Sequence, residues 1–471
     1  MNYPKSFIVL ILSAVWVFYN SVFSGTILYF DSLGYDYLGK ILIGPHPEQY
    51  LIQGPSREPL YPMFVSLNMV LANNLHIPYT HLILLTQGLL LLWGQSILFG
   101  IFQRIKVQDG ISAVILAYFV FSPTILRSSL IVYSEIFTYV PMLLVCLKAI
   151  ETWDKFKKPD MFQKGYHKCA IGLGAIFLPI MFAKAIFELI APVFLFLFAF
   201  GLYMRNRKHK YSLKKCLIFF ILAYGAFELP VIGYKALNKV YNGNFAFTDR
   251  GSRALYGTTA RRALPTSPQE DLAQMLYVFP DKSICDQIAG KEPCSHWFYV
   301  LSDTLGSQKY LELKSKGYSI EKINSVLSAM ALKLMLSHPF RTIKGMFWEG
   351  AKICFWEYPS WGMVILPRDV RSVYDLPGIN YFFLFGVNLV SVLFFLIGLW
   401  FCIFKLFQFN QIGVNGSDVR EYLLIAFSLI INYIIAHSFF FLNERNALPI
   451  IPIFLVMIGT ASKTMLEGKR T

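Results

Sequence analysis

Residues 7–28 read FIVLILSAVWVFYNSVFSGTIL, a mostly apolar run without a charged side chain. An α-helix rises about 1.5 Å per residue, so a run of this length crosses the roughly 30 Å of hydrocarbon in a bilayer. No small-residue cleavage site follows a short apolar core, which favours a retained signal anchor over a cleaved signal peptide. The run therefore predicts a membrane-spanning helix at the start of the chain.

Similar apolar runs recur along all 471 residues, of which 55% are hydrophobic and only 15% charged. Ordinary soluble domains carry about 25% charged residues. We therefore predict an all-α polytopic membrane protein with about ten transmembrane helices. The predicted spans cover residues 7–28, 80–103, 111–126, 130–149, 169–183, 186–204, 215–236, 379–405, 421–442 and 447–465.

The net charge of +15 is concentrated in short connections between spans, above all 150–168 and 205–214. Lys and Arg gather in cytoplasmic loops by the positive-inside rule, which explains these clusters without a polyanionic partner. We therefore expect no nucleic-acid binding. The same rule places the amino terminus and the connections 104–110 and 406–420 in the cytoplasm.

Three parts follow from this topology. Residues 1–236 form an N-terminal transmembrane module with a first outer loop at 29–79, and residues 379–471 hold the C-terminal transmembrane helices. Between them, 237–378 is a large non-cytoplasmic loop. Structureless loops of this length are rare, so we expect it to fold as a helical cap.

Two outer stretches have a helical pattern without spanning. The apolar stretch Leu60–Leu75 follows Pro59, which suits a first helical turn, and we predict a helix lying at the outer interface. In the cap, the stretch 330–348 is mostly apolar, and Pro339 should break or kink it. The aromatic-rich segment 355–358 that follows is typical of the bilayer interface, or of a platform for sugar rings.

Five of the seven cysteines lie in or beside apolar runs, where a lone cysteine behaves as a small hydrophobic residue. Cys285 and Cys294 instead lie close together in a polar stretch of the large loop. In an oxidising compartment we expect a disulfide between them. The sequence has no CxxC, HExxH or Walker motif, so it predicts no metal site and no nucleotide site of these kinds.

Charged residues at the rims of spans are expensive in a membrane, and each is a functional-site hypothesis. Here several of them converge on the predicted outer face, from elements far apart in the sequence. A mixture of bases and carboxylates suits a phosphate-bearing ligand and a reaction that needs a base. These residues are Asp31, Asp36, Arg57, Glu135, Lys184, Glu444 and Arg445.

The runs DSLGY at 31–35 and REPLYP at 57–62, with the pair SE at 134–135 opening a helix, resemble the GT-C superfamily of membrane glycosyltransferases. The run NERNALPIIP at 443–452 is similar to that superfamily's Glu-Arg-aromatic-x-x-Pro pattern. It departs from the pattern at Asn446, where an aromatic residue is usual.

The resemblance implies an enzyme that uses a polyprenyl-phosphate-linked sugar donor on the outer face. It places the general base in the first outer loop, where Asp31 is the first choice and Asp36 the second. The implied ligands of the donor phosphate are Arg57, Lys184, Glu444 and Arg445, with Arg445 preferred for its fork geometry. Tyr35, Tyr61 and Glu135 are further candidate site residues.

The sequence leaves the sugar open, and the acceptor could be a lipid, a glycan or a protein. Cofactors stay open too: Mg²⁺ or Mn²⁺ between Asp31, Asp36 and Glu135 is an option that a phosphate-lipid leaving group does not require. The predicted outer face has no Asn-x-Ser/Thr site. This favours a bacterial inner membrane with the active site facing the periplasm, in contact with membrane lipids.

Two alternative functions stay open. A ligase or polymerase of lipid-linked glycans would place its essential arginines in the large loop, where Arg250, Arg253, Arg261 and Arg262 are available. A lipid or glycan flippase would favour inverted repeats and charges near the midplane of the membrane. The sequence shows no convincing repeat, and its charges lie at one rim.

Overall fold

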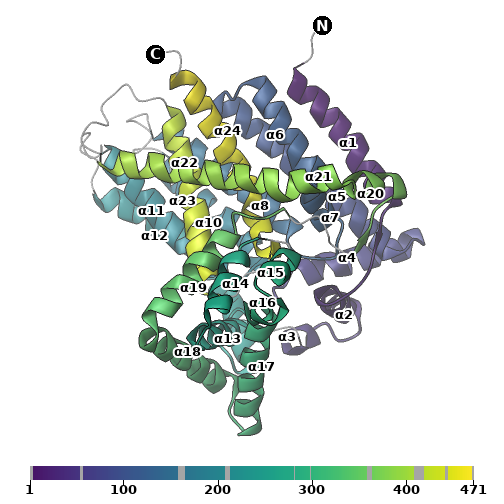
Figure 1. Ribbon diagram of the computed structural model, residues 1–471, viewed down its shortest axis with the longest axis vertical. Coiled ribbons are helices and arrows are strands. Elements are labelled where there is room, and N and C mark those ends of the chain that lie inside the picture. The colour runs from purple at the N-terminus through teal and green to yellow at the C-terminus, as the bar shows by residue number, and fades with distance from the viewer. Residues whose placement is uncertain are drawn as a thin grey trace.

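The computed structural model describes residues 4–53, 57–156, 165–206, 213–279, 282–297, 299–357, 363–407, 418–440 and 444–468. The described chain is almost entirely helical (Figure 1). Within these ranges the only strands are β1 (Gly25–Thr26) and β2 (Val364–Ile365), which pair antiparallel. Gly25 lies opposite Ile365, and Thr26 opposite Val364.

Nine helical segments of the described chain are long and apolar enough to cross a membrane, or ten if a bent pair counts as one span. This confirms the prediction of an all-α polytopic membrane protein. In Figure 1, α22 crosses in front of the other spanning helices. The spanning elements are α1 (Lys5–Phe23), α5 (Tyr79–Ile105), α8 (Ile136–Lys155), α10 (Tyr166–Ala183), α11 (Phe187–Asn206), α12 (Leu213–Asn242), the stretch Pro377–Trp400 that runs into α22 (Asn388–Phe407), α23 (Asp418–Ser438) and α24 (Ile451–Gly468), with the bent pair α6 (Asp109–Phe121) and α7 (Pro123–Ser129).

The outer ends of several predicted spans differ from the structure: α12 continues to Asn242 instead of 236, and α23 ends at Ser438 instead of 442. Three further differences involve a strand or a bend. The first helix ends at Phe23 instead of 28, because the next residues form β1. The span predicted at 111–126 bends by 50° between α6 and α7. Pro123 lacks the N–H that would continue α6, and the Ser122 side chain caps α7 by accepting from the Ile125 N–H at 3.1 Å.

The third difference concerns the span predicted at 130–149. Its helix, α8, begins only at Ile136, and 130–135 form a bend between α7 and α8. Glu135 therefore stands at the N-cap position of α8, where the sequence pattern placed it. This bend brings Ser134 and Glu135 to the end of the bundle that carries the cap.

The two ends of the bundle are distinguished by contacts between charged residues. At one end, Arg104 lies 3.1 Å from Asp154, and Arg205 lies 3.3 Å from Glu421. Both termini lie at this end (Figure 1). The helices α1, α5 and α8 each run from one end to the other, so the residues that begin α8 and follow α1 share the opposite end.

The first outer loop forms α2 (Asp31–Ile43), α3 (Gln49–Gln53) and α4 (Leu60–Leu75). The helix predicted over 60–75 is confirmed, with Pro59 at its N-cap. Helix α2 packs closely on α4, and a Cβ atom on Gly39 would lie only 2.8 Å from the Val65 side chain. This close approach fixes α2, and with it Asp31, against the transmembrane module.

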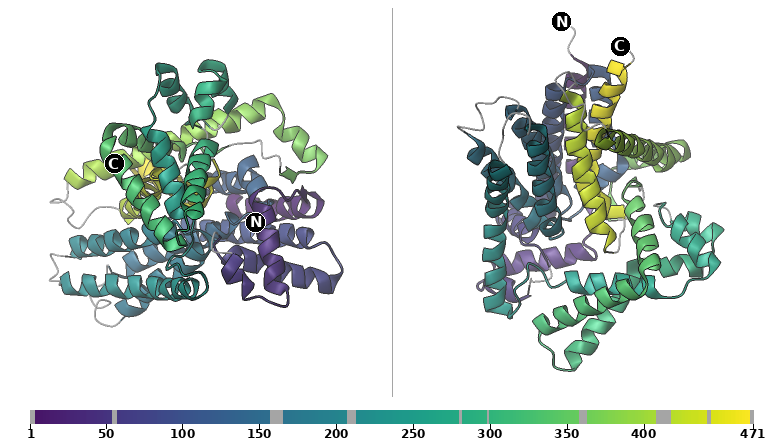
Figure 2. Two further views of the ribbon diagram at one scale, coloured as in Figure 1. Left: turned by 90° about the horizontal axis from the view of Figure 1, so that it is seen from below. Right: turned by 90° about the vertical axis from the view of Figure 1, so that its left-hand side faces the viewer.

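The large loop is helical, and Figure 2 (right) shows its helices between residues 251 and 352 gathered at the end opposite both termini. The predicted break at Pro339 is confirmed: α18 ends at Ser337 and α19 begins at Pro339. We refer to α13–α19 as the cap. The elements of the loop are α13 (Gly251–Ala263), α14 (Pro268–Leu276), α15 (Lys282–Ile288), α16 (Lys291–Trp297), α17 (Tyr299–Ser315), α18 (Ile320–Ser337), α19 (Pro339–Lys352), α20 (Arg368–Tyr374) and α21 (Pro377–Tyr381), and the π-helical turn η2 (Phe382–Val387) joins them to α22.

The segment that leaves the cap enters the bundle. Trp356 and Glu357 are fully buried, although this segment was expected at the bilayer interface or as an exposed platform. The Trp356 indole donates to the Tyr118 hydroxyl at 2.7 Å, and the Glu357 N–H donates to the Asn388 side chain at 3.0 Å. The expectation was wrong because polar partners on α6 and α22 satisfy this segment inside the protein. Tyr358 lies outside the described residues.

Candidate functional site

An arginine–aspartate pair lies at the start of α2. The Arg57 guanidinium donates to the Asp31 carboxylate at 2.5 Å. The Arg57 and Asp31 side chains stay 16% and 18% exposed. Asp31 occupies the first turn of α2, where the helix dipole favours a negative charge. The pair is therefore fixed in place but open to a ligand.

Tyr35 lies one helical turn after Asp31 and faces the same arginine. The Arg57 guanidinium carbon lies 5.3 Å from the centre of the Tyr35 ring, a cation–π distance. Burial opposes the charge of Arg57, but Tyr35 and Asp31 outweigh it and raise the Arg57 pKa. The Tyr35 hydroxyl lies 3.2 Å from the Ser134 hydroxyl, which connects α2 to the bend before α8.

Tyr61, the second candidate tyrosine, is fully buried beneath this layer. Its ring packs edge-on against Tyr35, with centroids 4.7 Å apart. Its hydroxyl donates to Gln87 at 2.6 Å, and the Gln87 amide donates to the carbonyls of Ser129 and Ile131. Tyr61 therefore positions Tyr35 and the bend, and the structure leaves it no access to a ligand.

A second ion pair joins the bend to the end of α10. The Lys184 ammonium lies 2.8 Å from the Glu135 carboxylate, which is buried. The next residue, Ala185, donates its backbone N–H to the Glu58 carboxylate at 3.0 Å. Because Glu58 follows Arg57 directly, this bond brings the two ion pairs close together.

The cap contributes one arginine to the same place. Arg250 stands at the N-cap position of α13 and interacts electrostatically with Arg57, Asp31 and Glu58. Burial, and then the positive charge of Arg57, lower the pKa of Arg250. From the sequence, Arg250 was only one of four loop arginines considered, and only for the alternative function of a ligase or polymerase. No pattern around it marks it as the one that reaches the first outer loop.

These groups form one site, which we call the rim cluster. It holds three carboxylates and three cations at the boundary between the transmembrane module and the cap. The cations can bind a phosphate, and an accessible carboxylate can accept a proton. The rim cluster comprises Asp31, Arg57, Glu58, Glu135, Lys184 and Arg250, with Tyr35 beneath Arg57.

Asp36 lies elsewhere. It follows Asp31 by five residues, which is about 140° around a helix of 3.6 residues per turn. Its carboxylate accepts from the Tyr79 hydroxyl at 2.5 Å and from Lys40 at 2.8 Å. The structure therefore directs Asp36 to α5 and not to the rim cluster.

The side chains of Glu444 and Arg445 lie outside the described part of the chain. Their backbone belongs to the short 3₁₀ helix η4 (Glu444–Ile450), which contacts α8. The Tyr433 hydroxyl donates to the Asn446 carbonyl at 2.5 Å, which fixes η4 to α23. The structure thus places this backbone beside the helix that Glu135 begins.

The other loop arginines have different partners. Arg261 and Arg262 both contact Glu349 on α19 in a buried cluster, and Arg262 also donates to the Ser438 carbonyl at 2.6 Å. Arg253 faces the Tyr310 ring at 5.7 Å. Among the loop arginines considered for a ligase or polymerase, Arg250 is therefore the one that reaches the rim cluster.

Within the described ranges, no group of three or more His, Cys, Asp or Glu side chains is placed to hold a metal ion. His437 is buried, with a ring nitrogen 3.2 Å from the Tyr433 carbonyl. Comparison with models of known protein families found no match, and comparison with curated proteins found none either.

Proposed function

We propose that the protein is a membrane glycosyltransferase, which moves a sugar from a polyprenyl-phosphate donor to an acceptor on the non-cytoplasmic face. The observation that carries the proposal is the rim cluster, in which Arg57, Lys184 and Arg250 converge beside an accessible Asp31. Three cations at a membrane rim suit the phosphate of a lipid carrier. The proposed location is a bacterial inner membrane, with the site facing the periplasm.

In the proposed reaction, Asp31 takes the proton from an acceptor hydroxyl while the hydroxyl oxygen attacks the anomeric carbon. The bond between that carbon and the phosphate oxygen breaks, and the lipid phosphate leaves with the electron pair. Its negative charge is stabilised by Arg57, Lys184 and Arg250. The acceptor is a lipid, a glycan or a protein, and the step itself requires no metal.

The Asp31–Arg57 ion pair gives this mechanism an order of events. In the ion pair, the Arg57 guanidinium occupies one oxygen of the Asp31 carboxylate. A donor phosphate that binds Arg57 competes for this contact and leaves the carboxylate open to the acceptor hydroxyl. Donor binding is therefore expected to precede activation of the acceptor.

The test compares Asp31→Asn with Asp36→Asn in membranes, following sugar release from a polyprenyl-phosphate sugar. Both changes remove a carboxylate from α2, but only Asp31 contacts Arg57. We expect Asp31→Asn to lower transfer by about 10²–10⁴-fold, as for loss of a general base, and Asp36→Asn to lower it far less. Equal transfer by Asp31→Asn and wild type would overturn the assignment of the base.

Arg250 favours a second candidate, a ligase or polymerase of lipid-linked glycans with an essential arginine in its large loop. Arg250→Met and Asp31→Asn separate the two functions. A glycosyltransferase of the proposed kind loses most transfer with Asp31→Asn. A ligase or polymerase loses it with Arg250→Met and tolerates Asp31→Asn.

A further inference from the structure

Helix α19 of the cap has its polarity reversed relative to a helix of a water-soluble domain. Its buried face carries Glu349 and Lys352, which are 1% and 2% exposed. Its outward face carries Phe340 and Phe347, which are 87% and 65% exposed. Soluble domains bury the apolar face of an amphipathic helix, so α19 is arranged as for an apolar surrounding.

The buried polar face of α19 is well satisfied. Glu349 binds Arg261 and Arg262, and the Lys352 ammonium donates to the Tyr277 carbonyl at 2.7 Å. The orientation of α19 is therefore fixed by charged contacts inside the cap. Rotating the helix to bury Phe340 would break these contacts and leave charges without partners.

Helix α18 continues the apolar surface and becomes less polar along its length. Its first turn pairs Glu321 with Lys239 of α12 at 2.6 Å. Its last turns expose Leu332 and Leu336, at 57% and 73%. Together with Phe340, Ile343 and Phe347 of α19, these residues form an apolar strip on two consecutive helices, which we call the elbow.

The elbow is continuous with the outer surface of a spanning helix. An almost wholly apolar groove of about 240 Å³ lies between α18, α11 and the end of α23. Leu332 and Met335 line one side, and Leu189 and Phe439 line the other. Leu189 begins the exposed apolar stripe of α11, which continues through Val193, Phe196 and Phe200.

We propose that the elbow is immersed in the outer leaflet of the membrane, with the chain of a bilayer phospholipid in the groove. We infer a lipid chain as the occupant because the groove is continuous with the apolar stripe of α11. Helix α11 is long and apolar enough to cross the membrane, so this stripe faces lipid. Lys344 flanks the elbow and pairs with Asp271 of α14 at 2.6 Å, so its charge is neutralised within the cap. The cap then has one wall in lipid and does not stand free in water.

This proposal is independent of the reaction catalysed and is tested by the depth of spin labels in phospholipid vesicles. Nitroxide labels are attached to Phe340→Cys and, separately, to Ile343→Cys, in the full chain. Cys402 is replaced by Ser in each variant, and the other free cysteines, Cys146, Cys169, Cys216 and Cys354, are buried. Leu311→Cys on α17 is the matched control. Leu311 is also apolar and 61% exposed, but lies on a helix whose Glu312 is paired with Lys309 and Lys316.

The readout is the ratio of collisions with oxygen, which enters lipid, to collisions with a water-soluble nickel chelate. We expect this ratio to be several-fold higher at 340 and 343 than at 311. A ratio at 340 and 343 equal to that at 311 places the elbow in water and overturns the proposal. Low collision rates with both reagents at 340 and 343 also overturn it, because they show a protein surface covering the elbow.

Discussion

Two groups in this molecule pair arginine with a carboxylate, but their side chains differ in how much they are exposed to solvent. In the rim cluster, Arg57 meets Asp31 with about a sixth of each side chain exposed, at 16% and 18%. In the cap, Arg261 and Arg262 share Glu349, and none of the three side chains is more than 1% exposed. Burial without access favours a structural role, and partial exposure at a boundary favours ligand binding.

The charge balance of the two groups also differs. The rim cluster is balanced, with three carboxylates and three cations. The cap group has two guanidinium groups around one carboxylate, and burial, the largest cause, lowers the pKa of Arg262. Glu349 raises it in part. Removing this carboxylate should therefore affect folding, whereas removing Asp31 should affect activity.

The largest effect on stability is expected from Glu349→Ala. The change leaves two arginines buried without their shared carboxylate, and breaking a buried ion pair in this way costs about 3–5 kcal/mol. The measurement is thermal unfolding of the purified protein in detergent, beside Asp31→Ala as the matched control. If the two variants lose the same amount of stability, the Glu349 group is no more structural than the rim cluster, and the comparison fails.

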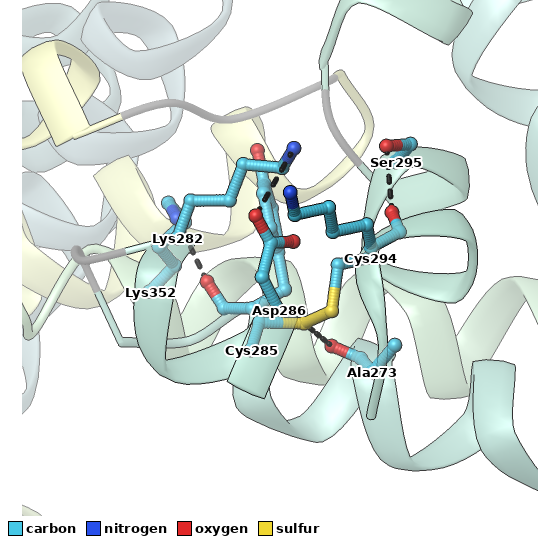
Figure 3. Close-up of a disulfide and its surroundings, with 9 residues drawn as sticks. Ala273, Lys282, Cys285, Asp286, Cys294, Ser295 and Lys352 are labelled. Atoms are coloured by element: carbon cyan, nitrogen blue, oxygen red, sulfur yellow. Dashed lines mark hydrogen bonds and ion pairs between the residues drawn. A yellow bond between two sulfur atoms is a disulfide. The ribbon is translucent and has the colours of Figure 1, made fainter. Parts of the chain in front are cut away.

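A smaller loss of stability is expected from removing the disulfide near the cap group. Cys285 and Cys294 are joined by a disulfide, as expected from their positions in the sequence, and Figure 3 shows the pair close to Lys352. Closing a loop of this size, with a sequence separation of 9, stabilises by about 2–3 kcal/mol in the chain-entropy model.

The double variant Cys285→Ser with Cys294→Ser should unfold at a lower temperature than wild type, and a reductant should no longer change its midpoint. Because the disulfide lies in the cap, donor binding at the rim cluster should be retained. If the variant loses donor binding while its cap stays folded, the disulfide and the rim cluster are not independent of each other, which contradicts this prediction.

Arg57→Lys sharpens the comparison within the rim cluster. Lysine keeps the positive charge but loses the planar fork that binds a phosphate or carboxylate through two N–H groups. We expect donor affinity to fall about tenfold, which corresponds to roughly 1.4 kcal/mol. Arg253→Lys, which changes an arginine facing Tyr310, is the control and should leave donor affinity unchanged.

The smallest effect concerns Glu357, a carboxyl as buried as Glu349 but hydrogen-bonded to the hydroxyls of Ser122, Tyr118 and Thr124. Burial raises its pKa, and these hydroxyls lower it in part. A raised folded-state pKa gives stability that is complete below the ordinary glutamic acid pKa and is lost as the pH rises through the raised value.

Glu357→Gln removes this titration, so its thermal midpoint should depend less on pH than that of wild type. As the pH rises, the thermal midpoint of wild type should therefore fall relative to the midpoint of Glu357→Gln. A difference that does not change with pH would show that Glu357 does not titrate in the folded protein.

Much of the fold could be predicted from the sequence, because long apolar runs have few alternatives in a membrane. The helix Leu60–Leu75 and the break at Pro339 followed from local rules for proline and apolar periodicity. The bend at 130–135 could not be predicted in this way. Residues 130–133 are as apolar as those of the adjoining helices, and the break before the bend depends on how α7 packs.

The rim cluster was predicted in part. Asp31, Arg57, Glu135 and Lys184 followed from the cost of charge at the ends of spans. Arg250 could not be selected from the sequence, since its position depends on how the cap folds back onto the first outer loop. Asp36 could not be separated from Asp31 without the orientation of α2, which packing against α4 determines.

The short ladder between β1 and β2 has a consequence for how the cap can move. It joins the outer end of α1 to the segment that leaves the cap, while α12 holds the segment that enters it. Asn238 of α12 fastens the entering segment through the carbonyls of Ala246 and Phe247. A lid hinged at one side could swing open without breaking bonds, but a domain fastened on both sides cannot. Under the proposed function, substrates would therefore reach Asp31 laterally, between the cap and the membrane, or one of the two attachments would break in each reaction cycle.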